Sequence, residues 1–102
     1  MSGRFSVFFS EGVKDDLKQL RACDRQIILN AIETHLTQAP TAMTTQRKLL
    51  RNLVPPFEAV PPIWQLRVGA FRVFYDVRAE ERRVYVRAVR RKPAHRQTEE
   101  ML

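Results

Sequence analysis

The segment from Trp64 to Lys92 constrains the fold more than any other part of this 102-residue sequence. Apolar and polar residues alternate through WQLRVGAFRVFYDV, a charged RAEERR follows, and the alternation resumes in VYVRAVRRK. A period of two is typical of strands that bury one face, and glycine at a tight connection favours a two-residue hairpin turn. The segment therefore predicts three short antiparallel strands joined by turns.

The two turns predict which residues face one another across the strands. With Gly69-Ala70 as the first turn, the facing pairs are Val68 with Phe71, Arg67 with Arg72, Leu66 with Val73, and Trp64 with Tyr75. With Glu80-Glu81 at the centre of the second turn, the pairs are Val77 with Val84, Tyr75 with Val86, Phe74 with Arg87, and Val73 with Ala88. The second turn lacks glycine and asparagine, so a longer loop and a shifted register remain open.

This register separates the two faces of the predicted sheet. The apolar face, which we expect helices to cover, collects Trp64, Leu66, Val68, Phe71, Val73, Tyr75, Val77, Val84, Val86 and Ala88. The opposite face collects Gln65, Arg67, Arg72, Phe74, Asp76, Tyr85, Arg87 and Val89. We expect this second face to be uncovered, because its charged residues are rarely buried.

The N-terminal part predicts a strand followed by a helical hairpin. Phe5–Phe9 alternates weakly, as in a strand, and Ser10 is a predicted N-cap for a helix that carries Val13, Leu17 and Leu20 at helical spacing. Asp24 is a predicted N-cap for a second helix, which ends before Pro40. Its apolar stripe is Ile27, Ile28, Ala31, Ile32 and Leu36. The expected fold is therefore α+β, in the order β-α-α-β-β-β, with a small antiparallel sheet covered on one face by this hairpin.

The remaining segments are less informative. Lys48 to Leu53 is compatible with one helical turn or with a short strand, and the prolines at positions 55, 56, 61 and 62 exclude regular structure after it. A short C-terminal helix could begin near Thr98. The length predicts one domain over residues 1–102.

The composition indicates which classes of partner to expect. The net charge is +7, and arginine supplies fourteen of the eighteen basic residues. A basic surface favours nucleic acid as the partner and an acidic protein as the next choice. We expect no membrane segment, because no apolar run approaches the roughly 18 residues of a spanning helix. The single Cys23 fits the reducing cytoplasm, where we expect the protein to act.

Arg67 opposite Arg72 is an anomaly within the predicted hairpin. Like charges directly across a sheet destabilise it by roughly 0.2–1 kcal/mol. A bound phosphate would convert this repulsion into charge-assisted hydrogen bonds, and Phe74 and Tyr85 beside the pair could stack on RNA bases. The alternative is that Asp76 or a protein partner neutralises the two arginines.

The motif around these arginines resembles the RelE/ParE superfamily of type II toxins. The resemblance rests on the stretch Leu66–Val77, with its pattern Leu-Arg-x-Gly-x-aromatic-Arg-Val-x-Tyr, and on Val84–Lys92 after a charged turn. It extends to the first strand and the helix that contains Lys14–Leu17, whereas residues 41–62 match nothing in the family. The resemblance implies an α+β toxin that a cognate antitoxin wraps and neutralises.

The superfamily implies two different activities. Its RelE-like branch cuts messenger RNA on the ribosome without a metal, whereas its ParE-like branch inhibits DNA gyrase and cuts nothing. A degenerate relative that only binds its antitoxin is a third possibility. Paired arginines favour the endoribonuclease, and the lack of a tyrosine after Tyr85 favours the gyrase inhibitor.

The resemblance also implies roles for individual residues. Arg72 matches the arginine that contacts the scissile phosphate in the nucleases, and Arg67 matches a basic position in the preceding strand. One further phosphate-contacting cation is Arg90, Arg91 or Lys92, and Arg87 lies on the same predicted face. Where many of these nucleases use a tyrosine or histidine for proton transfer, this chain offers only His95.

Other chemistry has little support in the sequence. Asp76 and Glu58 would be weak bases among arginines, because neighbouring cations lower the pKa of a carboxylate, and we expect His35 to be structural or exposed. One cysteine and two distant histidines predict no zinc site, and neither a phosphate-binding glycine loop nor a nucleophile motif is present. We therefore expect no metal and no cofactor.

Overall fold

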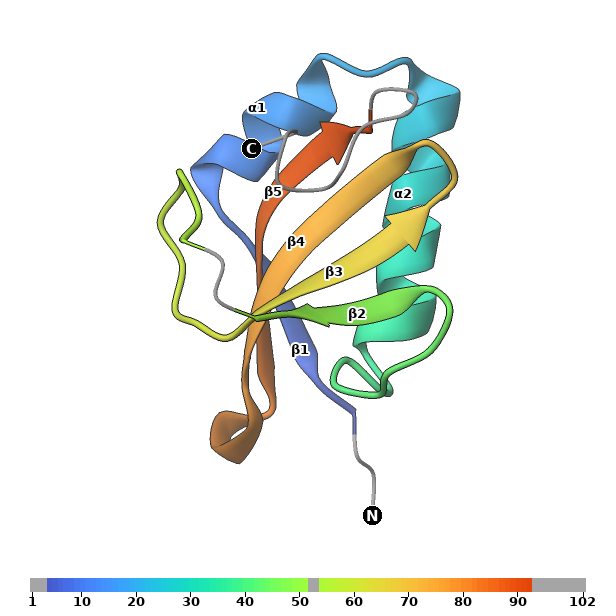
Figure 1. The fold of residues 1–102 in the computed structure, drawn as a ribbon. Coiled ribbons are helices and arrows are strands. Elements are labelled where there is room, and N and C mark those ends of the chain that lie inside the picture. Colours follow the sequence, from blue (N-terminus) through green and yellow to red (C-terminus); the bar gives the residue numbers. More distant parts are fainter. Residues whose placement is uncertain (1–3, 52–53, 93–102) are drawn as a thin grey trace.

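The computed structural model describes residues 4–51 and 54–92 (Figure 1). The helices and strands of this part are β1 (Ser6–Phe9), α1 (Glu11–Lys18), α2 (Ala22–Leu36), β2 (Arg47–Leu50), β3 (Ile63–Val68), β4 (Phe71–Arg78), a 3₁₀ turn η1 (Ala79–Glu81) and β5 (Arg83–Arg91). The predicted α+β class is confirmed, and strand β2 begins one residue before the stretch Lys48 to Leu53, which could have been a helical turn or a strand.

The described strands form one five-stranded sheet in the order β1-β5-β4-β3-β2. Neighbouring strands from β2 to β5 are antiparallel, as predicted, whereas β1 joins β5 in parallel at the edge, with Phe8 beside Tyr85. Helix α2 lies behind the strands in Figure 1, so that view looks onto the face of the sheet that α2 does not cover.

The helical hairpin begins as predicted but differs at its second helix. Ser10 caps α1, and its hydroxyl accepts a hydrogen bond from the Val13 amide at 3.3 Å. Helix α2 begins at Ala22 with Arg21 at the N-cap, so the prediction of Asp24 as the cap was wrong. Asp24 lies in the first turn of the helix and accepts a hydrogen bond from Arg21, and its charge suits the helix N-terminus.

The main core lies between the hairpin and the sheet. Ile28, Ile32 and Leu36 of α2 are buried against it, whereas Ile27 is 58% exposed and was wrongly assigned to this face. Successive helical residues lie about 100° apart, and Leu29 rather than Ile27 packs against the core beside Ile28. None of the helices in the described part is long and apolar enough to cross a bilayer.

The register of the first hairpin is confirmed and that of the second is confirmed only in part. Arg67 faces Arg72, and Trp64 faces Tyr75. Tyr75 also faces Val86, but Phe74 faces Ala88 rather than Arg87, because Arg87 is the extra residue of a β-bulge. The bulge exchanges the predicted faces of Ala88 and Val89, so Val89 packs in the main core and Ala88 on the opposite side.

A second, smaller core on the opposite face contradicts the expectation that this face is uncovered. It contains Leu50, Ile63, Phe74 and Ala88, against which Phe57 and Ala59 of the proline-rich segment pack. Phe74 is fully buried and lies 6.0 Å from Phe57 between ring centroids. The apolar residues between the prolines cover part of the sheet, and Phe74 is therefore unavailable for stacking on a base.

Candidate functional site

A cationic pocket opens beside the turn between β3 and β4. Its volume is about 260 Å³. Its lining residues are Met43, Thr44, Thr45, Gln46, Arg47, Lys48, Gln65, Arg67, Arg72 and Lys92. We call this the cationic pocket; it combines the loop before β2, the edge of the sheet and the residue that follows β5.

Arg67 and Arg72 lie side by side in this pocket, as the sequence predicted. Arg67 is exposed, whereas Arg72 is only 7% exposed, and its Nη1 donates to the carbonyls of Gly69 at 2.9 Å and Phe71 at 2.8 Å. Burial lowers the pKa of Arg72, and the neighbouring charge of Arg67 lowers it further. The guanidinium stays protonated because arginine does not lose its proton in proteins, and an anion in the pocket would relieve this repulsion.

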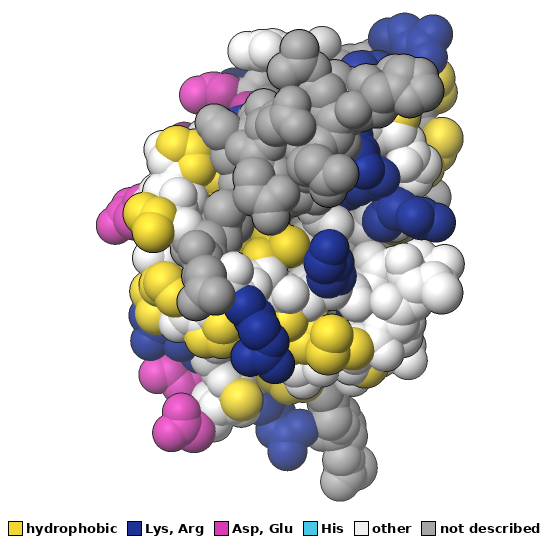
Figure 2. Space-filling view, viewed as in Figure 1, with side chains coloured by type: hydrophobic (Ala, Val, Ile, Leu, Met, Phe, Trp, Pro, Cys, Tyr) yellow, Lys and Arg dark blue, Asp and Glu magenta, His cyan; other side chains and the backbone are white. Residues whose placement is uncertain are grey.

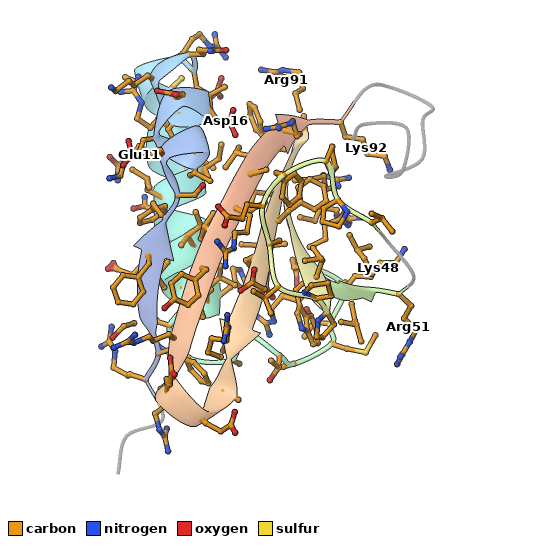
Figure 3. The ribbon with its side chains drawn as sticks, turned by 90° about the vertical axis from the view of Figure 1, so that its left-hand side faces the viewer. Glu11, Asp16, Lys48, Arg51, Arg91 and Lys92 are labelled. Carbon is orange, nitrogen blue, oxygen red and sulfur yellow. The ribbon has the colours of Figure 1, made fainter. Side chains whose placement is uncertain are left out.

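Lysines complete the pocket on the side away from the helices. Lys48 and Lys92 line it, and Figure 3 shows both on the same side of the sheet as Arg51, while Glu11 and Asp16 lie with α1 on the other side. Within residues 4–51 and 54–92, no carboxylate forms an ion pair with Lys48, Arg67, Arg72 or Lys92. Figure 2 shows the same segregation, with Lys and Arg across the middle of the face and Asp and Glu at its left margin.

Of the three C-terminal cations that the sequence left open, Lys92 lines the pocket and the other two contact helix carboxylates. Arg90 donates to Asp16 at 2.7 Å, and Arg91 lies 3.9 Å from Asp24 and 4.5 Å from the Phe71 ring centroid. The bulge at Arg87 turns Arg91 toward the helices and leaves Lys92 on the pocket side. The structure therefore groups Lys92 with Arg67 and Arg72.

Arg87 also lies outside the pocket, in a buried ion pair. Asp76 is 1% exposed and accepts hydrogen bonds from Arg87 Nε at 2.6 Å and Nη2 at 3.3 Å. It accepts a third from the amide of Val60 at 3.0 Å, which fastens segment 54–62 to the sheet. Asp76 and Arg87 therefore stabilise the fold. Asp76 pairs with Arg87 and does not neutralise Arg67 and Arg72, as the alternative required.

A polar network supports the floor of the pocket behind Arg47. Arg47 is 9% exposed; its Nε donates to the carbonyl of Ala42 at 2.9 Å, and its Nη1 donates to Nδ1 of His35 at 2.7 Å. The buried hydroxyl of Tyr75 donates to the carbonyl of Pro40. These bonds tie the loop before β2 to α2 and to β4, so His35 is structural, as the sequence allowed.

The His35–Arg47 contact predicts a pH-dependent stability. Burial lowers the pKa of His35, and the charge of Arg47 lowers it further. The folded state then binds a proton less readily than the unfolded chain, whose histidine pKa is about 6.5. This contribution to stability is therefore complete above that pH and is lost as the pH falls toward the lowered pKa of the folded state.

Urea denaturation between about pH 7.5 and pH 5.5 checks this expectation, because carboxylates remain largely ionised there. We expect the midpoint to fall with acidification in the wild type and to change less in His35→Asn, whose amide oxygen can accept from Arg47 without titrating. Equal pH dependence in both proteins would contradict the assignment.

The sequence did not reveal one lysine of the pocket, and it suggested contact residues that lie outside the pocket. Lys48 was not a predicted site residue, although alternation along β2 places it on the same face as Gln65. Phe74 and Arg87 were predicted contacts, but Phe74 is buried in the second core and the largely buried Arg87 pairs with Asp76. Tyr85 lies outside the pocket and stacks on Phe8, so its predicted contact with RNA stays a prediction. His95 and the helix expected near Thr98 lie outside the described residues.

Chemically, the pocket can bind an anion with several donors at once. Two guanidinium groups offer planar pairs of N–H donors that match phosphate oxygens, and the lysines add point charges. The described lining contains no carboxylate, histidine or tyrosine. It supplies charge stabilisation, whereas a group for proton transfer would have to come from a lysine or from beyond the described residues.

Comparison with known proteins identifies the relatives of this fold. Residues 7–93 match the family described as the ParE toxin of the type II toxin–antitoxin system parDE. No curated protein matches the sequence significantly.

Two solved structures share the fold at low sequence identity. The toxin–antitoxin complex RelBE2 from Mycobacterium tuberculosis has a chain that aligns with a TM-score of 0.68 and 19% identity, over 87% of this chain and 99% of that one. A chain of the archaeal RelE–RelB complex from Pyrococcus horikoshii aligns with a TM-score of 0.69 and 18% identity, over 92% and 99%.

Proposed function

The chain belongs to the ParE toxin family of type II toxin–antitoxin systems, within the RelE/ParE superfamily, and we propose that it is a metal-independent endoribonuclease that cuts messenger RNA with the ribosome as partner. The observation that carries this proposal is the cationic pocket, where Arg67 and Arg72 lie together with Lys92 and no described carboxylate neutralises them. The phosphates of an RNA backbone can bind and neutralise these cations.

The proposed reaction uses the RNA's own hydroxyl group as the nucleophile. The 2′-oxygen attacks the adjacent phosphorus as the bond from phosphorus to the 5′-oxygen breaks, which leaves a 2′,3′-cyclic phosphate and a 5′-hydroxyl. Arg67 and Arg72 would stabilise the charge that develops on the phosphorane oxygens. A base must take the 2′-hydroxyl proton and an acid must protonate the leaving oxygen; His95 remains our proposal for one of these roles.

The proposed partners follow from family and charge. A type II toxin requires a cognate antitoxin, and both structural relatives were solved as complexes with antitoxin. With a net charge of +7, this chain favours an antitoxin with an acidic toxin-binding segment. We propose the cytoplasm, where messenger RNA is translated, as the site of action.

Inhibition of DNA gyrase is the second candidate function. Two observations favour it: the matching family is the ParE family, and the described pocket lining holds no histidine, tyrosine or carboxylate for proton transfer. In that case the cations would bind an acidic protein surface or DNA without cleaving it.

Two assays on the purified protein separate these functions. As an endoribonuclease it should cut a translated messenger RNA at discrete positions in a reaction that contains ribosomes, and it should leave gyrase-catalysed supercoiling unchanged. Loss of supercoiling with intact RNA would replace the proposal by the second candidate. No effect in either assay would indicate a degenerate toxin that only binds its antitoxin.

A further inference from the structure

An aromatic pair with one exposed ring, Phe8, and one half-buried ring, Tyr85, lies at the edge of the sheet, away from the cationic pocket. Phe8 of β1 faces Tyr85 of β5, and their rings are stacked with centroids 5.4 Å apart and planes at 23°. Phe8 is 44% exposed, while its neighbours Val7 and Phe9 pack against the main core. The stack belongs to neither core among the described residues, so its role is not to hold the two layers together.

Arginines flank both rings of this pair. The Arg83 guanidinium lies 5.6 Å from the Phe8 centroid, and that of Arg87 lies 5.0 Å from the Tyr85 centroid. Arg87 is fixed by Asp76, whereas the Arg83 side chain is 50% exposed, forms an ion pair with the exposed Glu81 at 3.7 Å and also interacts with Tyr85. Single exposed aromatics are ordinary, but alternating aromatic and guanidinium groups form a surface suited to stacking.

The aromatic pair shares the face of the sheet that carries the pocket arginines. Tyr85 lies on the side opposite Val84 and Val86, which are buried in the main core. Along β5, Tyr85 is five residues from Arg90, the residue opposite Arg72, or roughly 16 Å at the usual rise per residue. A single strand of several nucleotides can span this distance.

We propose that Phe8 and Tyr85, flanked by Arg83 and Arg87, form a stacking platform for bases of a single-stranded RNA whose phosphates occupy the cationic pocket. Aromatic faces bind any base, and nearby arginines add contacts to the backbone and to the base plane. The net charge of +7 suits a polyanion, and the position of this surface on the face that carries the pocket arginines favours one that also reaches the pocket. The inference rests on the proposed function, because it gives the RNA held at the pocket a second point of contact.

Binding of an uncleavable probe tests the platform apart from catalysis. The probe is a short, fluorescently labelled 2′-O-methyl RNA, which lacks the attacking hydroxyl. We expect Phe8→Leu to weaken binding by roughly 5- to 150-fold, the effect of losing one stacked base. Phe8→Trp should bind as tightly as the wild type, because it restores an aromatic face.

Ile27→Leu is the matched control, since it changes an exposed apolar side chain on α2 away from the platform. Its affinity should equal that of the wild type, and the unfolding midpoints of all variants should agree. A folded Phe8→Leu that binds the probe like the wild type overturns the inference. So does a Phe8→Leu that loses antitoxin affinity alone, which would make this surface a protein contact.

The two proposals can fail separately. If the wild type binds the probe through Phe8 but cuts no messenger RNA, the stacking platform stands and the nuclease proposal is wrong. If the wild type cuts messenger RNA and Phe8→Leu binds the probe normally, the platform is wrong and the nuclease proposal stands.

Discussion

Replacing Asp76 by alanine should destabilise the fold by about 3–5 kcal/mol, because it leaves the buried charge of Arg87 without its partner. Asp76 accepts two hydrogen bonds from Arg87 and one from Val60, and it is 1% exposed. A domain of this size has a total stability of roughly 5–15 kcal/mol, so the variant should be near the limit of folding. Urea denaturation measures the loss through the midpoint.

The exposed pair between Glu81 and Arg83 provides the control for this prediction. Its side chains are 57% and 50% exposed at 3.7 Å, and Glu81→Ala should change the stability by about 1 kcal/mol or less. The double variant Asp76→Leu with Arg87→Met should recover much of the stability lost in Asp76→Ala, because it removes both buried charges together. A loss below about 1 kcal/mol in Asp76→Ala would show that this pair does not hold segment 54–62 on the sheet.

Replacing Arg67 by glutamine should reduce toxicity and RNA cleavage by roughly 100-fold or more, the usual cost of removing a donor to a developing oxyanion. Arg67 is exposed and forms no ion pair with the described residues, so its loss should leave the fold unchanged. Growth after induced expression and the rate of messenger RNA cleavage measure the effect.

Substitutions of Arg51 and Arg72 provide the comparison for the Arg67→Gln result. Arg51 lies on the same side as Lys48 and Lys92 in Figure 3 but does not line the pocket, so Arg51→Gln should keep full activity. Arg72→Lys keeps a charge but loses the planar pair of N–H donors that matches phosphate oxygens, and we expect it to be impaired while folded. If Arg67→Gln and Arg51→Gln are equally toxic, the pocket is not the site of action.

Local patterns predicted the first hairpin and the helical layer well. Gly69 has a φ of 59°, so a glycine is favoured at the turn, and the position of this turn fixes every pair from Val68 with Phe71 to Trp64 with Tyr75. In the same way, Ser10 marks the start of α1 through a contact three residues away. Such features depend on a few neighbouring residues, which is why the sequence reveals them.

The bulge at Arg87 could not be predicted because distant residues stabilise it. Ser10 donates to the carbonyl of Arg87 at 3.3 Å, Asp16 accepts from the amide of Val89 at 3.0 Å, and Asp76 holds the Arg87 side chain. The bulge shifts the register of the following residues, and Lys92 rather than Arg91 lines the pocket with Arg72. The proline-rich segment 54–62 likewise has no periodicity to predict that Phe57 covers Phe74.

The salt dependence of RNA binding tests the central claim most directly, because it counts phosphate contacts without requiring cleavage. The logarithm of the association constant for the uncleavable 2′-O-methyl RNA should fall linearly with the logarithm of salt concentration, and Arg67→Gln should reduce the magnitude of the slope by about 0.7, the share of one phosphate contact on a single strand. Arg51→Gln should keep the wild-type slope. An unchanged slope in Arg67→Gln would show that the pocket does not bind the RNA backbone.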